Sequence, residues 1–545
     1  MYLKHNVKLA PHIWSWYAWS HLISPHTAGM NVVERHMKIM ESFIEYPDMH
    51  YEAINTRGMI GGPFINLPPS KQPIIKALFE KTKKECAKLI QLDADIKAFD
   101  KMLQEKAVGG SLEEYYKLLP ESLQGMVELA YDMNSHPQIR FIEPILYQRY
   151  YDESAQSISL SEIVDDSRPF CLSTPDINDD AALQLKIPFS SKVIDKLMKM
   201  KSVSSDPLAL VDELNVKPDD VERYMRLFTE EPPIKKDNEF HGVGVRIRYF
   251  GHACMLLQTK DVSILIDPVL GYNYDGLQTD RFTYVDLPET IDYVLVTHNH
   301  QDHFLLEVLL QLRSRIKNFI VPTTNEGSIA DPSMKLVLQH LGFSNIRTLQ
   351  ALDEIDLGGG NKITALPFLG EHGDLDIRSK LGYHVNLCNL SMMFLADSNS
   401  LDGRLYDYIF EHTGPVDMMF IGMECVGAPL SWLYGPLLSK PLSRDNDRSR
   451  RLSGSNYKKA LEIIEKSGAK EVSVYAMGME PWLGYVMAVD YKPTSLPMLE
   501  SDKLVEHCSQ HKIKSQRLYG KQEWVFAKGM YEASHRMEKE VVNAV

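Results

Sequence analysis

The stretch LVTHNHQDHF, residues 295–304, carries three histidines and an aspartate within six positions, directly after an apolar run. The four potential donors are His298, His300, Asp302 and His303. In this HxHxDH spacing, one turn can direct two donors at one metal ion and two at a neighbouring ion. The alternative is a polar loop that caps the following helix, with Asp302 as the cap. Because three histidines serve no purpose in capping, the spacing favours a site for two cations.

The chain divides near residue 237. Its 545 residues, 44% of them apolar, are enough for about two to four domains. In the first half, residues 32–46 and 74–103 carry apolar side chains at helical spacing, and strand signals are sparse. The stretch TEEPPIKKDNEFHGV, residues 229–243, has the prolines and charges of an exposed connector. We therefore predict a mostly helical N-terminal domain, residues 1–236, and a second domain, residues 237–545.

The second domain alternates short β-branched and aromatic runs with helical segments. This texture predicts an α/β or layered α+β architecture. The predicted strands lie in VRIRYFG, VSILIDP, DYVLVTH, NFIVPT, KITALPFLG, YHVNLC, SMMFLAD, MMFIGME and EVSVYAM.

Acidic and imidazole groups recur where these runs end. The residues at the exits are Asp267, His298, Glu371, Asp397 and Glu424. Open sheets present their ligand-binding loops at strand exits. Each of these residues taken alone is also compatible with an ordinary turn. The prediction of a metal site therefore depends mainly on the HxHxDH cluster.

The HxHxDH cluster resembles the signature of the metallo-β-lactamase fold, an αβ/βα sandwich with a dinuclear metal site along one edge. GHACMLL (251–257) and SILIDP (263–268) resemble the early strands of that fold. The resemblance implies this sandwich for residues 237–545. Because the fold hosts hydrolases, redox enzymes and oxygenases, it does not decide the function.

The remaining ligands separate these classes. Hydrolytic members usually supply further histidines from a later loop and from near the C-terminus. Here the later loop, FLGEHGDL, offers adjacent Glu371 and His372, and the last strand exit, SVYAMGMEPW, has no histidine. With Glu371 as ligand, the site is rich in carboxylates and suits iron or manganese better than zinc. With His372 as ligand, a dinuclear zinc hydrolase of a thioester, lactone or phosphodiester is favoured.

A broader similarity extends through nearly the whole chain. The sequence is similar to the diiron β-hydroxylases of nonribosomal peptide biosynthesis, which hydroxylate an amino acid tethered to a carrier protein. The matching segments are WSWYAWSHLISP, MIGGPFI, YYDES, THNHQDH, LPFLGEHGDLDIRSK, FIGMEC, SWLYGPL, RSRRLSGSN and YAMGMEPWLGYVM.

This resemblance implies a ligand set. It comprises His298, His300 and Glu371 on one iron, Asp302 and His303 on the other, and Asp397 as the bridge. Glu424 would take part in catalysis near the cluster, or is an ordinary buried acid bonded to backbone.

The resemblance also implies the reaction. It is a monooxygenase reaction of an oxo- or hydroxo-bridged diiron site, which uses O2 and an external two-electron donor to β-hydroxylate an aminoacyl thioester on a peptidyl carrier protein. The N-terminal domain would cover the active site and form a homodimer. Besides the zinc hydrolase, a third interpretation is a metal-stabilised scaffold that binds a carrier without chemistry.

Bulk charge and composition limit the partners. The net charge of −14, from 73 acidic and 59 basic residues, argues against nucleic acid. Without a signal-peptide pattern or a run approaching ~18 apolar residues, we expect no membrane segment and a cytoplasmic location. The six cysteines contain no CxxC pair, and we expect them to be small core residues.

Two surface questions stay open. Arg444, Arg448, Arg450 and Arg451 could face an acidic carrier protein, or could pair with neighbouring aspartates in a solvated loop. The aromatic cluster Trp14, Trp16, Tyr17 and Trp19 is favoured as core over a substrate or dimer surface.

Overall fold

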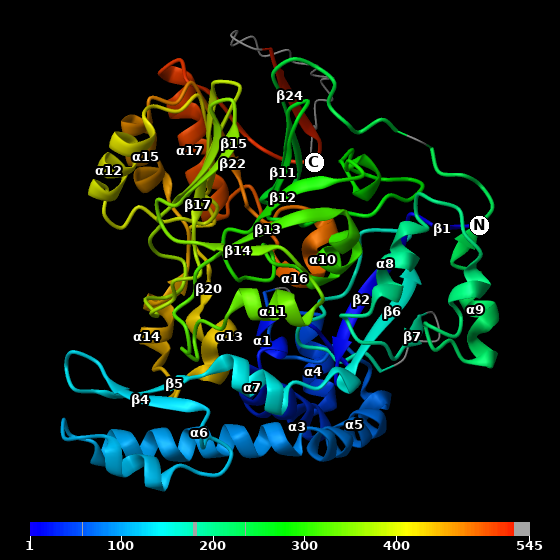
Figure 1. Ribbon diagram of the computed structural model, residues 1–545, viewed down its shortest axis with the longest axis vertical. Helices are drawn as coiled ribbons and strands as arrows, with labels where there is room; N and C mark the ends of the chain where they lie inside the picture. Colours follow the sequence, from blue (N-terminus) through cyan, green and yellow to red (C-terminus); the bar gives the residue numbers. More distant parts are fainter. Residues whose placement is uncertain (57, 178–181, 235, 528–545) are drawn as a thin grey trace.

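A computed structural model describes residues 1–56, 58–177, 182–234 and 236–527 of the chain. The N-terminal elements, blue to cyan in Figure 1, lie below and beside the C-terminal half, coloured green to red. None of the described helices is long and apolar enough to cross a membrane.

Helices dominate the N-terminal part. The prediction for residues 32–46 is confirmed by a π-helix and α3, whereas residues 74–103 form two helices rather than one. The backbone leaves the helical region at Cys86, so that α5 packs against α3 while α6 packs against α2. The helices are α1 (Ser20–Ile23), α2 (Pro25–Asn31), the π-helix (Val32–Met37), α3 (Lys38–Glu45), α4 (Pro47–Ile54), α5 (Gln72–Glu85), α6 (Ala87–Lys106), α7 (Glu143–Tyr150), α8 (Lys192–Lys199) and α9 (Val221–Met225).

The N-terminal part also contains a four-stranded sheet, ordered β3-β2-β6-β7, that the sequence did not indicate. One of its two central strands, β2, has the sequence VKLAPHI, and Pro11 within it argues against a central strand when the sequence is read alone. The strands are β2 (Val7–Ile13), β3 (Trp16–Tyr17), β6 (Gln156–Glu162) and β7 (Leu183–Leu185), with the small pairs β1 (Tyr2–Leu3) and β8 (Phe228–Thr229), and β4 (Val127–Tyr131) and β5 (Pro137–Phe141).

The C-terminal part is the predicted sandwich of two seven-stranded sheets. Each of the nine apolar runs predicted as strands overlaps one strand of these sheets. The first sheet is ordered β14 (Ile346–Leu349), β13 (Ile316–Pro322), β12 (Ile291–Leu295), β11 (Ser263–Ile266), β10 (Cys254–Gln258), β9 (Val245–Gly251) and β24 (Gln522–Phe526). The second is ordered β15 (Glu354–Gly358), β16 (Asn361–Leu366), β17 (Gly382–Leu387), β18 (Leu390–Phe394), β19 (Met418–Gly422), β22 (Glu471–Tyr475) and β23 (Lys514–Arg517).

Helices cover the outer faces of both sheets. Those of the C-terminal part are α10 (Leu306–Leu312), α11 (Met334–His340), α12 (Arg404–Thr413), α13 (Leu430–Tyr434), α14 (Arg444–Ser449), α15 (Tyr457–Ser467), α16 (Gly484–Met487) and α17 (Leu496–Gln510). Fully buried side chains such as Ile247, Tyr383 and Phe420 fill the space between the sheets. A further buried cluster, which includes Leu504 on α17, joins the second sheet to the helices on its outer face.

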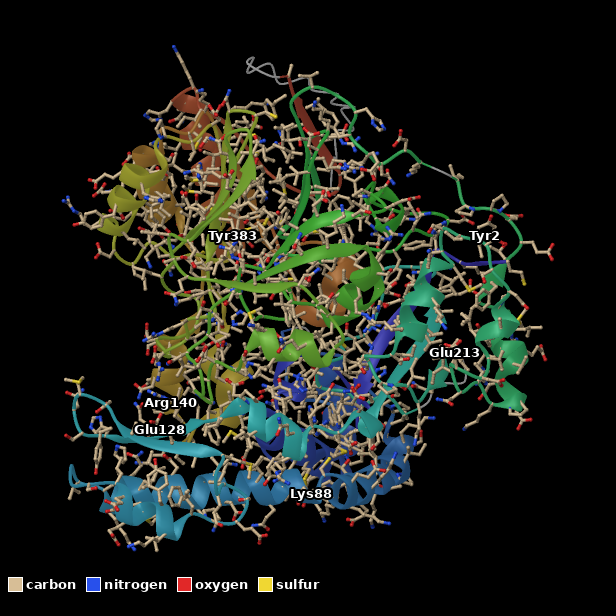
Figure 2. The ribbon with its side chains drawn as sticks, viewed as in Figure 1. Tyr2, Lys88, Glu128, Arg140, Glu213 and Tyr383 are labelled. Carbon is tan, nitrogen blue, oxygen red and sulfur yellow. The ribbon has the colours of Figure 1, made fainter. Side chains whose placement is uncertain are left out.

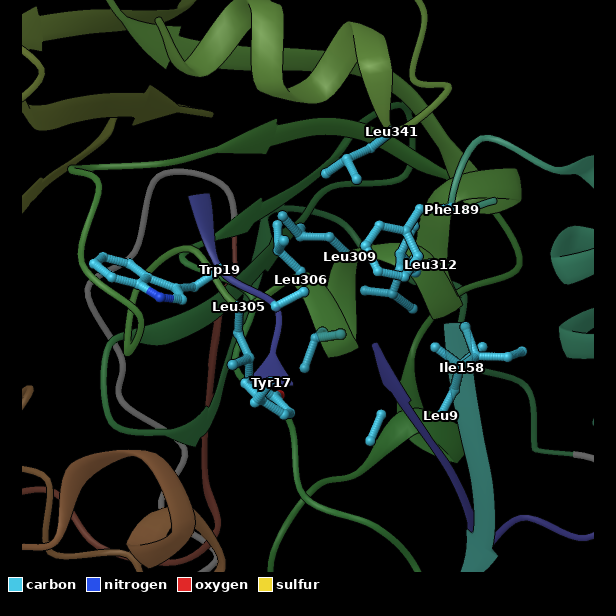
Figure 3. Packing of buried hydrophobic residues seen from close by; sticks show 14 of the residues in the cluster. Leu9, Tyr17, Trp19, Ile158, Phe189, Leu305, Leu306, Leu309, Leu312 and Leu341 are labelled. Carbon is cyan, nitrogen blue, oxygen red and sulfur yellow. The ribbon is translucent and has the colours of Figure 1, made fainter. Parts of the chain in front are cut away.

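Helix α10 connects the two parts of the molecule. Its leucines belong to the same buried cluster as Tyr17, Trp19 and Phe189 of the N-terminal part (Figure 3). Trp16, Tyr17 and Trp19 are all buried, which confirms that three of the four aromatic residues at the start of the chain belong to the core. Because α10 begins three residues after His303, the N-terminal part packs against the helix that follows the histidine-rich loop.

Candidate metal centre

The exits of several strands converge at one end of the sandwich. Strands β11 and β12 run parallel, as do β18 and β19, so the residues that follow each pair emerge at the same edge. The backbone N–H of Leu381 donates to the Thr297 carbonyl over 2.8 Å and ties the loop after β12 to the second sheet. Side chains more than 90 residues apart in sequence, such as His303 and Asp397, are thereby brought into contact.

His298, His300 and Glu371 form one compact group of donors. One ligand atom from each residue lies within 4.8 Å of the others. Glu371 Oε1 is 2.7 Å from His300 Nδ1, and Glu371 Oε2 is 3.9 Å from His298 Nε2. Two imidazoles and a carboxylate can hold one divalent cation here.

Asp397 joins this group to a second one. Its Oδ2 lies 3.1 Å from His303 Nε2 and 3.8 Å from His298 Nε2. Asp302 Oδ2 is 3.8 Å from the same nitrogen of His303. Asp397 therefore lies between donors of both groups, which is the position required of a bridging carboxylate.

His252, which the sequence analysis did not single out, completes the second group. Its Nε2 lies 3.3 Å from Asp302 Oδ2 and 3.2 Å from His303 Nε2. The backbone N–H of Gly478 points at His252 Nδ1 over 3.2 Å. If Nδ1 accepts this bond, the proton lies on Nε2 and His252 donates to Asp302 rather than binding metal. The signal for this residue was its place in GHACMLL, directly after β9.

Hydrogen bonds fix the orientation of His303. Asp267 Oδ2 is 2.8 Å from His303 Nδ1 and also accepts from Thr297 Oγ1 over 2.7 Å, while Asp267 Oδ1 accepts from the Thr297 backbone N–H. A carboxylate at Nδ1 keeps the imidazole proton there and leaves Nε2 as a donor for a metal. Asp267, predicted at a strand exit, thus supports a candidate ligand without facing the ion itself.

Backbone strain gathers at the same edge. Glu371, His252 and Asp267 have φ values of 71°, 49° and 42°, in the left-handed region that non-glycine residues avoid. Such conformations cost about 1–3 kcal/mol each and persist where the surrounding structure holds a functional side chain in place. Glu371 follows Gly370, which also has a positive φ, so the LGEHG segment forms a tight turn that directs the carboxylate inward.

The titration of the carboxylates reflects their crowding. Burial opposes the charge of Glu371, but His300 and His372 outweigh it and hold the pKa of that carboxyl well below its usual value. For Asp397, burial prevails over the attraction of His303 and raises the pKa. Without cations, the histidines are the main partners of these buried carboxylates.

Unpaired buried atoms provide a test of metal binding. Among the described residues, His298 Nε2 and Asp397 Oδ1 are buried without a hydrogen-bond partner. Leaving such groups unsatisfied costs about 1–3 kcal/mol each, more for charged groups. Both atoms belong to the group formed by His298, His303 and Asp397, so these residues fit a bound cation. Three carboxylates with three imidazoles favour iron or manganese.

His372 and Glu424 lie outside the three groups of donors that the described residues form. His372 Nδ1 is 2.7 Å from Glu371 Oε2 and 3.1 Å from His300 Nε2. Glu424 Oε1 accepts from the Tyr491 hydroxyl over 2.9 Å, and its Oε2 accepts from the Gly427 backbone N–H. Glu371 and His372, the two candidates for the same ligand position, are thus in contact, and only Glu371 belongs to a group of clustered donors.

A cavity of about 600 Å³ opens onto the donors. Asp302, Glu371 and Asp397 line it together with Glu424. Apolar residues and glycines from three segments, residues 58–64, 428–433 and 486–489, form much of the remaining wall. Since residues 58–64 belong to the N-terminal part, both parts of the chain enclose the candidate metal centre.

The arginine-rich stretch is divided in its contacts. Arg450 Nε donates to the Gly373 carbonyl over 2.7 Å, and Arg451 donates to the Gly427 carbonyl. Arg444 and Arg448, on α14, are exposed. Asp447 accepts from Ser431 rather than from an arginine, so the interpretation as a loop of arginine–aspartate pairs is wrong for this residue.

Comparison with known families matches both parts. Residues 2–232 match the N-terminal domain of the diiron non-heme β-hydroxylases, and residues 246–425 match the β-lactamase superfamily domain. The chain is 36% identical over 526 residues to 4-amino-L-phenylalanyl-[CmlP-peptidyl-carrier-protein] 3-hydroxylase of Streptomyces venezuelae, covering 95% of this chain and 98% of that protein.

Solved structures agree. The crystal structure of CmlA, a diiron β-hydroxylase from Streptomyces venezuelae, matches with a TM-score of 0.90 at 36% identity and covers 96% of this chain and 98% of that one. A structure of a mutant of the same hydroxylase matches with a TM-score of 0.89 at 35% identity, covering 96% and 99%. The UPF0173 protein PYRAB01190 of Pyrococcus abyssi is 33% identical over 129 residues, only 24% of this chain and 50% of that protein.

Proposed function

Since the chain belongs to the family of diiron non-heme β-hydroxylases, we propose that it hydroxylates the β-carbon of an amino acid held as a thioester by a peptidyl carrier protein. The reaction consumes O2, two electrons from an external donor and two protons. One oxygen atom enters the Cβ–H bond and the other leaves as water. The observation that carries this proposal is Glu371, a carboxylate among the clustered donors where hydrolases of this fold usually have histidine.

We assign the metal ligands as the sequence predicted. His298, His300 and Glu371 would hold one iron, and Asp302 and His303 the other. The shared position of Asp397 between His298 and His303 supports its role as the bridge. Bound iron would activate O2. Zinc cannot do so, because it has no redox chemistry.

The protein's own groups prepare this chemistry. Asp267 holds the proton of His303 at Nδ1 and thereby leaves Nε2 directed at the centre. The hydroxyl of Tyr434 lies 3.1 Å from His300 Nε2, the nitrogen that faces away from Glu371. Tyr434 is itself positioned by the N-terminal part, because Arg35 donates to the carbonyls of Trp432 and Leu433 on the same helix.

The cavity would admit the substrate on its flexible arm. Tethering makes the reaction effectively intramolecular once the carrier docks, and the apolar part of the wall limits access of water to the reacting carbon. We place the carrier near α14, where Arg444 and Arg448 are exposed. Arg450 is unsuited to a docking test, because its contact with Gly373 lies two residues from Glu371.

Residues 1–236 would serve as the cover of the active site and as the dimer surface, and residues 237–545 as the catalytic domain. The contribution of residues 58–64 to the cavity supports the first role. A homodimer and a cytoplasmic location complete the proposal, and sedimentation of the purified protein would test the dimer.

The first test is metal content combined with an absorption spectrum of protein produced with both iron and zinc in the medium. We expect two irons per chain and ferric absorption that bleaches on reduction. Two zincs with a featureless spectrum that iron reconstitution does not change would favour a hydrolase. Carriers loaded with different amino acids would then be incubated with reduced protein and O2 to identify the substrate.

A further inference from the structure

Glu424 is a mostly buried carboxylate in the wall of the active-site cavity. It accepts hydrogen bonds from Tyr491 Oη and from the backbone of Gly427. A carboxylate offers about four acceptor positions. Both of these donors, a phenol hydroxyl and a backbone N–H, are neutral groups. Glu424 therefore has acceptor capacity left for a cationic donor, and its two hydrogen-bond partners bring no positive charge.

A thioester-linked amino acid carries the matching charge. Its carboxyl group is consumed in the thioester and is neutral, whereas its α-amino group is protonated near neutral pH. Among the described residues that line the cavity there is no Lys or Arg to receive the carboxylate of a free amino acid. The chemistry of the wall thus fits a ligand with an ammonium group and no carboxylate.

Glu424 also stands at the right place relative to the centre. It follows β19 by two residues, and Asp397 follows the adjacent parallel strand β18 by three. The two strand exits are in close contact, because a Cβ atom added to Gly422 would lie 2.8 Å from Asp397 Oδ1. The β-carbon of an amino acid is two bonds from its nitrogen. An ammonium held at Glu424 would therefore keep the β-carbon close to the donor cluster.

We propose that Glu424 binds the α-ammonium group of the carrier-tethered amino acid, and that the enzyme therefore takes amino acids whose nitrogen is still free. This inference rests on the proposed function. It places the hydroxylation after the reaction that forms the thioester and before any reaction that acylates the nitrogen.

The test is equilibrium binding to the iron-loaded protein, which needs no turnover. The probes are phenylalanyl and leucyl pantetheine amides, stable analogues of the thioester, each with a free amine and in N-acetylated form. Apolar side chains are chosen because Phe64, Trp432 and Leu433 line the cavity. Loss of a charged hydrogen bond predicts that acetylation weakens binding about tenfold to a hundredfold.

Two variants and a control separate recognition from folding. Glu424→Gln should weaken binding of the free-amine probes by a similar factor and abolish the preference over the acetylated forms. Tyr491→Phe should keep the preference, since it leaves the carboxylate in place. Glu500→Gln is the matched control, because Glu500 also accepts from a backbone N–H and one side chain but lies outside the cavity.

Several outcomes would overturn the inference. They are equal binding of both forms by the wild-type protein, no binding of either, or a preference that survives Glu424→Gln. Slower product formation by Glu424→Gln with the preference intact would assign the residue to proton transfer instead. If the binding preference holds but no loaded carrier is hydroxylated, the proposed function fails and the recognition of the ammonium group stands.

Discussion

The ion pair between Arg168 and Glu307 gives a direct test of how the N-terminal part is held against the metal-binding loop. Arg168 donates two hydrogen bonds, over 2.8 and 2.9 Å, to the two oxygens of Glu307 on α10. The Glu307 side chain is completely buried and also accepts from Tyr17 and Tyr272, over 3.0 and 2.8 Å. Arg168→Met keeps most of the side-chain length, removes the charge and leaves Glu307 with two neutral donors.

The expected cost is about 3–5 kcal/mol of unfolding free energy, the usual penalty for stranding a buried charge. The two tyrosine hydroxyls place the value toward the lower end of that range. Urea unfolding followed by circular dichroism would measure it. The matched control is Arg140→Met, since Arg140 and Glu128 form an exposed pair on β4 and β5 (Figure 2), with 58% and 59% of their side chains exposed. That change should cost below about 1 kcal/mol.

The pH dependence sharpens the test. In the wild type, burial opposes the charge of Glu307, but Arg168 outweighs it and the pKa lies below its ordinary value of 4.5. The contribution of ionised Glu307 to the free energy of unfolding is then fully present above pH 4.5 and constant from pH 5 to 8. In Arg168→Met, burial acts without the cation and the pKa rises. The folded state then holds the extra proton, so stability falls as pH rises, by up to about 1.4 kcal/mol per unit.

Adding Glu307→Gln to Arg168→Met should remove that slope. A loss below 1 kcal/mol, or a slope no steeper than in the wild type, would refute the reasoning. Because α10 follows His303 directly, Arg168→Met should also weaken iron retention on dialysis, whereas Arg140→Met should not.

Three further predictions concern single groups. Glu371→Ala should lower the iron content below two per chain while His372→Ala retains both, and equal losses measured by elemental analysis would assign His372 as a ligand. Burial lowers the pKa of Lys201 from 10.5 to about 7. Between these pH values the unfolded chain binds a proton that the folded protein does not, so raising the pH disfavours unfolding and stability should rise by up to about 1.4 kcal/mol per pH unit. Lys201→Met should lack this rise when unfolding is measured at a series of pH values. Burial raises the pKa of Glu143 from 4.5 to about 7. The protein should therefore lose stability as the pH rises across that interval. If Glu143→Gln loses stability to the same extent, Glu143 is not the group responsible.

The sequence predicted those parts of the fold that local pattern controls. Nine of the fourteen strands in the two described sheets follow from short β-branched runs. The HxHxDH loop is contiguous, so its donors could be recognised without a structure. Glu371 and Asp397 could be proposed because each lies in the loop that follows an apolar run, and resemblance to a family assigned their roles.

Long-range packing controls the features that were missed. Strand β2 pairs with β6 about 150 residues later, and Pro11 in the middle of β2 argues against a central strand in the sequence. His252 reaches Asp302 only because β9 lies in the same sheet as β12. Residues 74–103 divide at Cys86 because α5 and α6 pack against different helices. The helical spacing of apolar residues carries no information about those packing partners.

The most direct test of the central claim is mass spectrometry of a carrier protein loaded with the amino acid identified by screening, after reaction with the reduced iron protein and isotopically heavy O2. The account predicts that the tethered amino acid gains one heavy oxygen atom at its β-carbon while the thioester stays intact. Release of the amino acid from the carrier without incorporation of the label would contradict it and indicate hydrolysis.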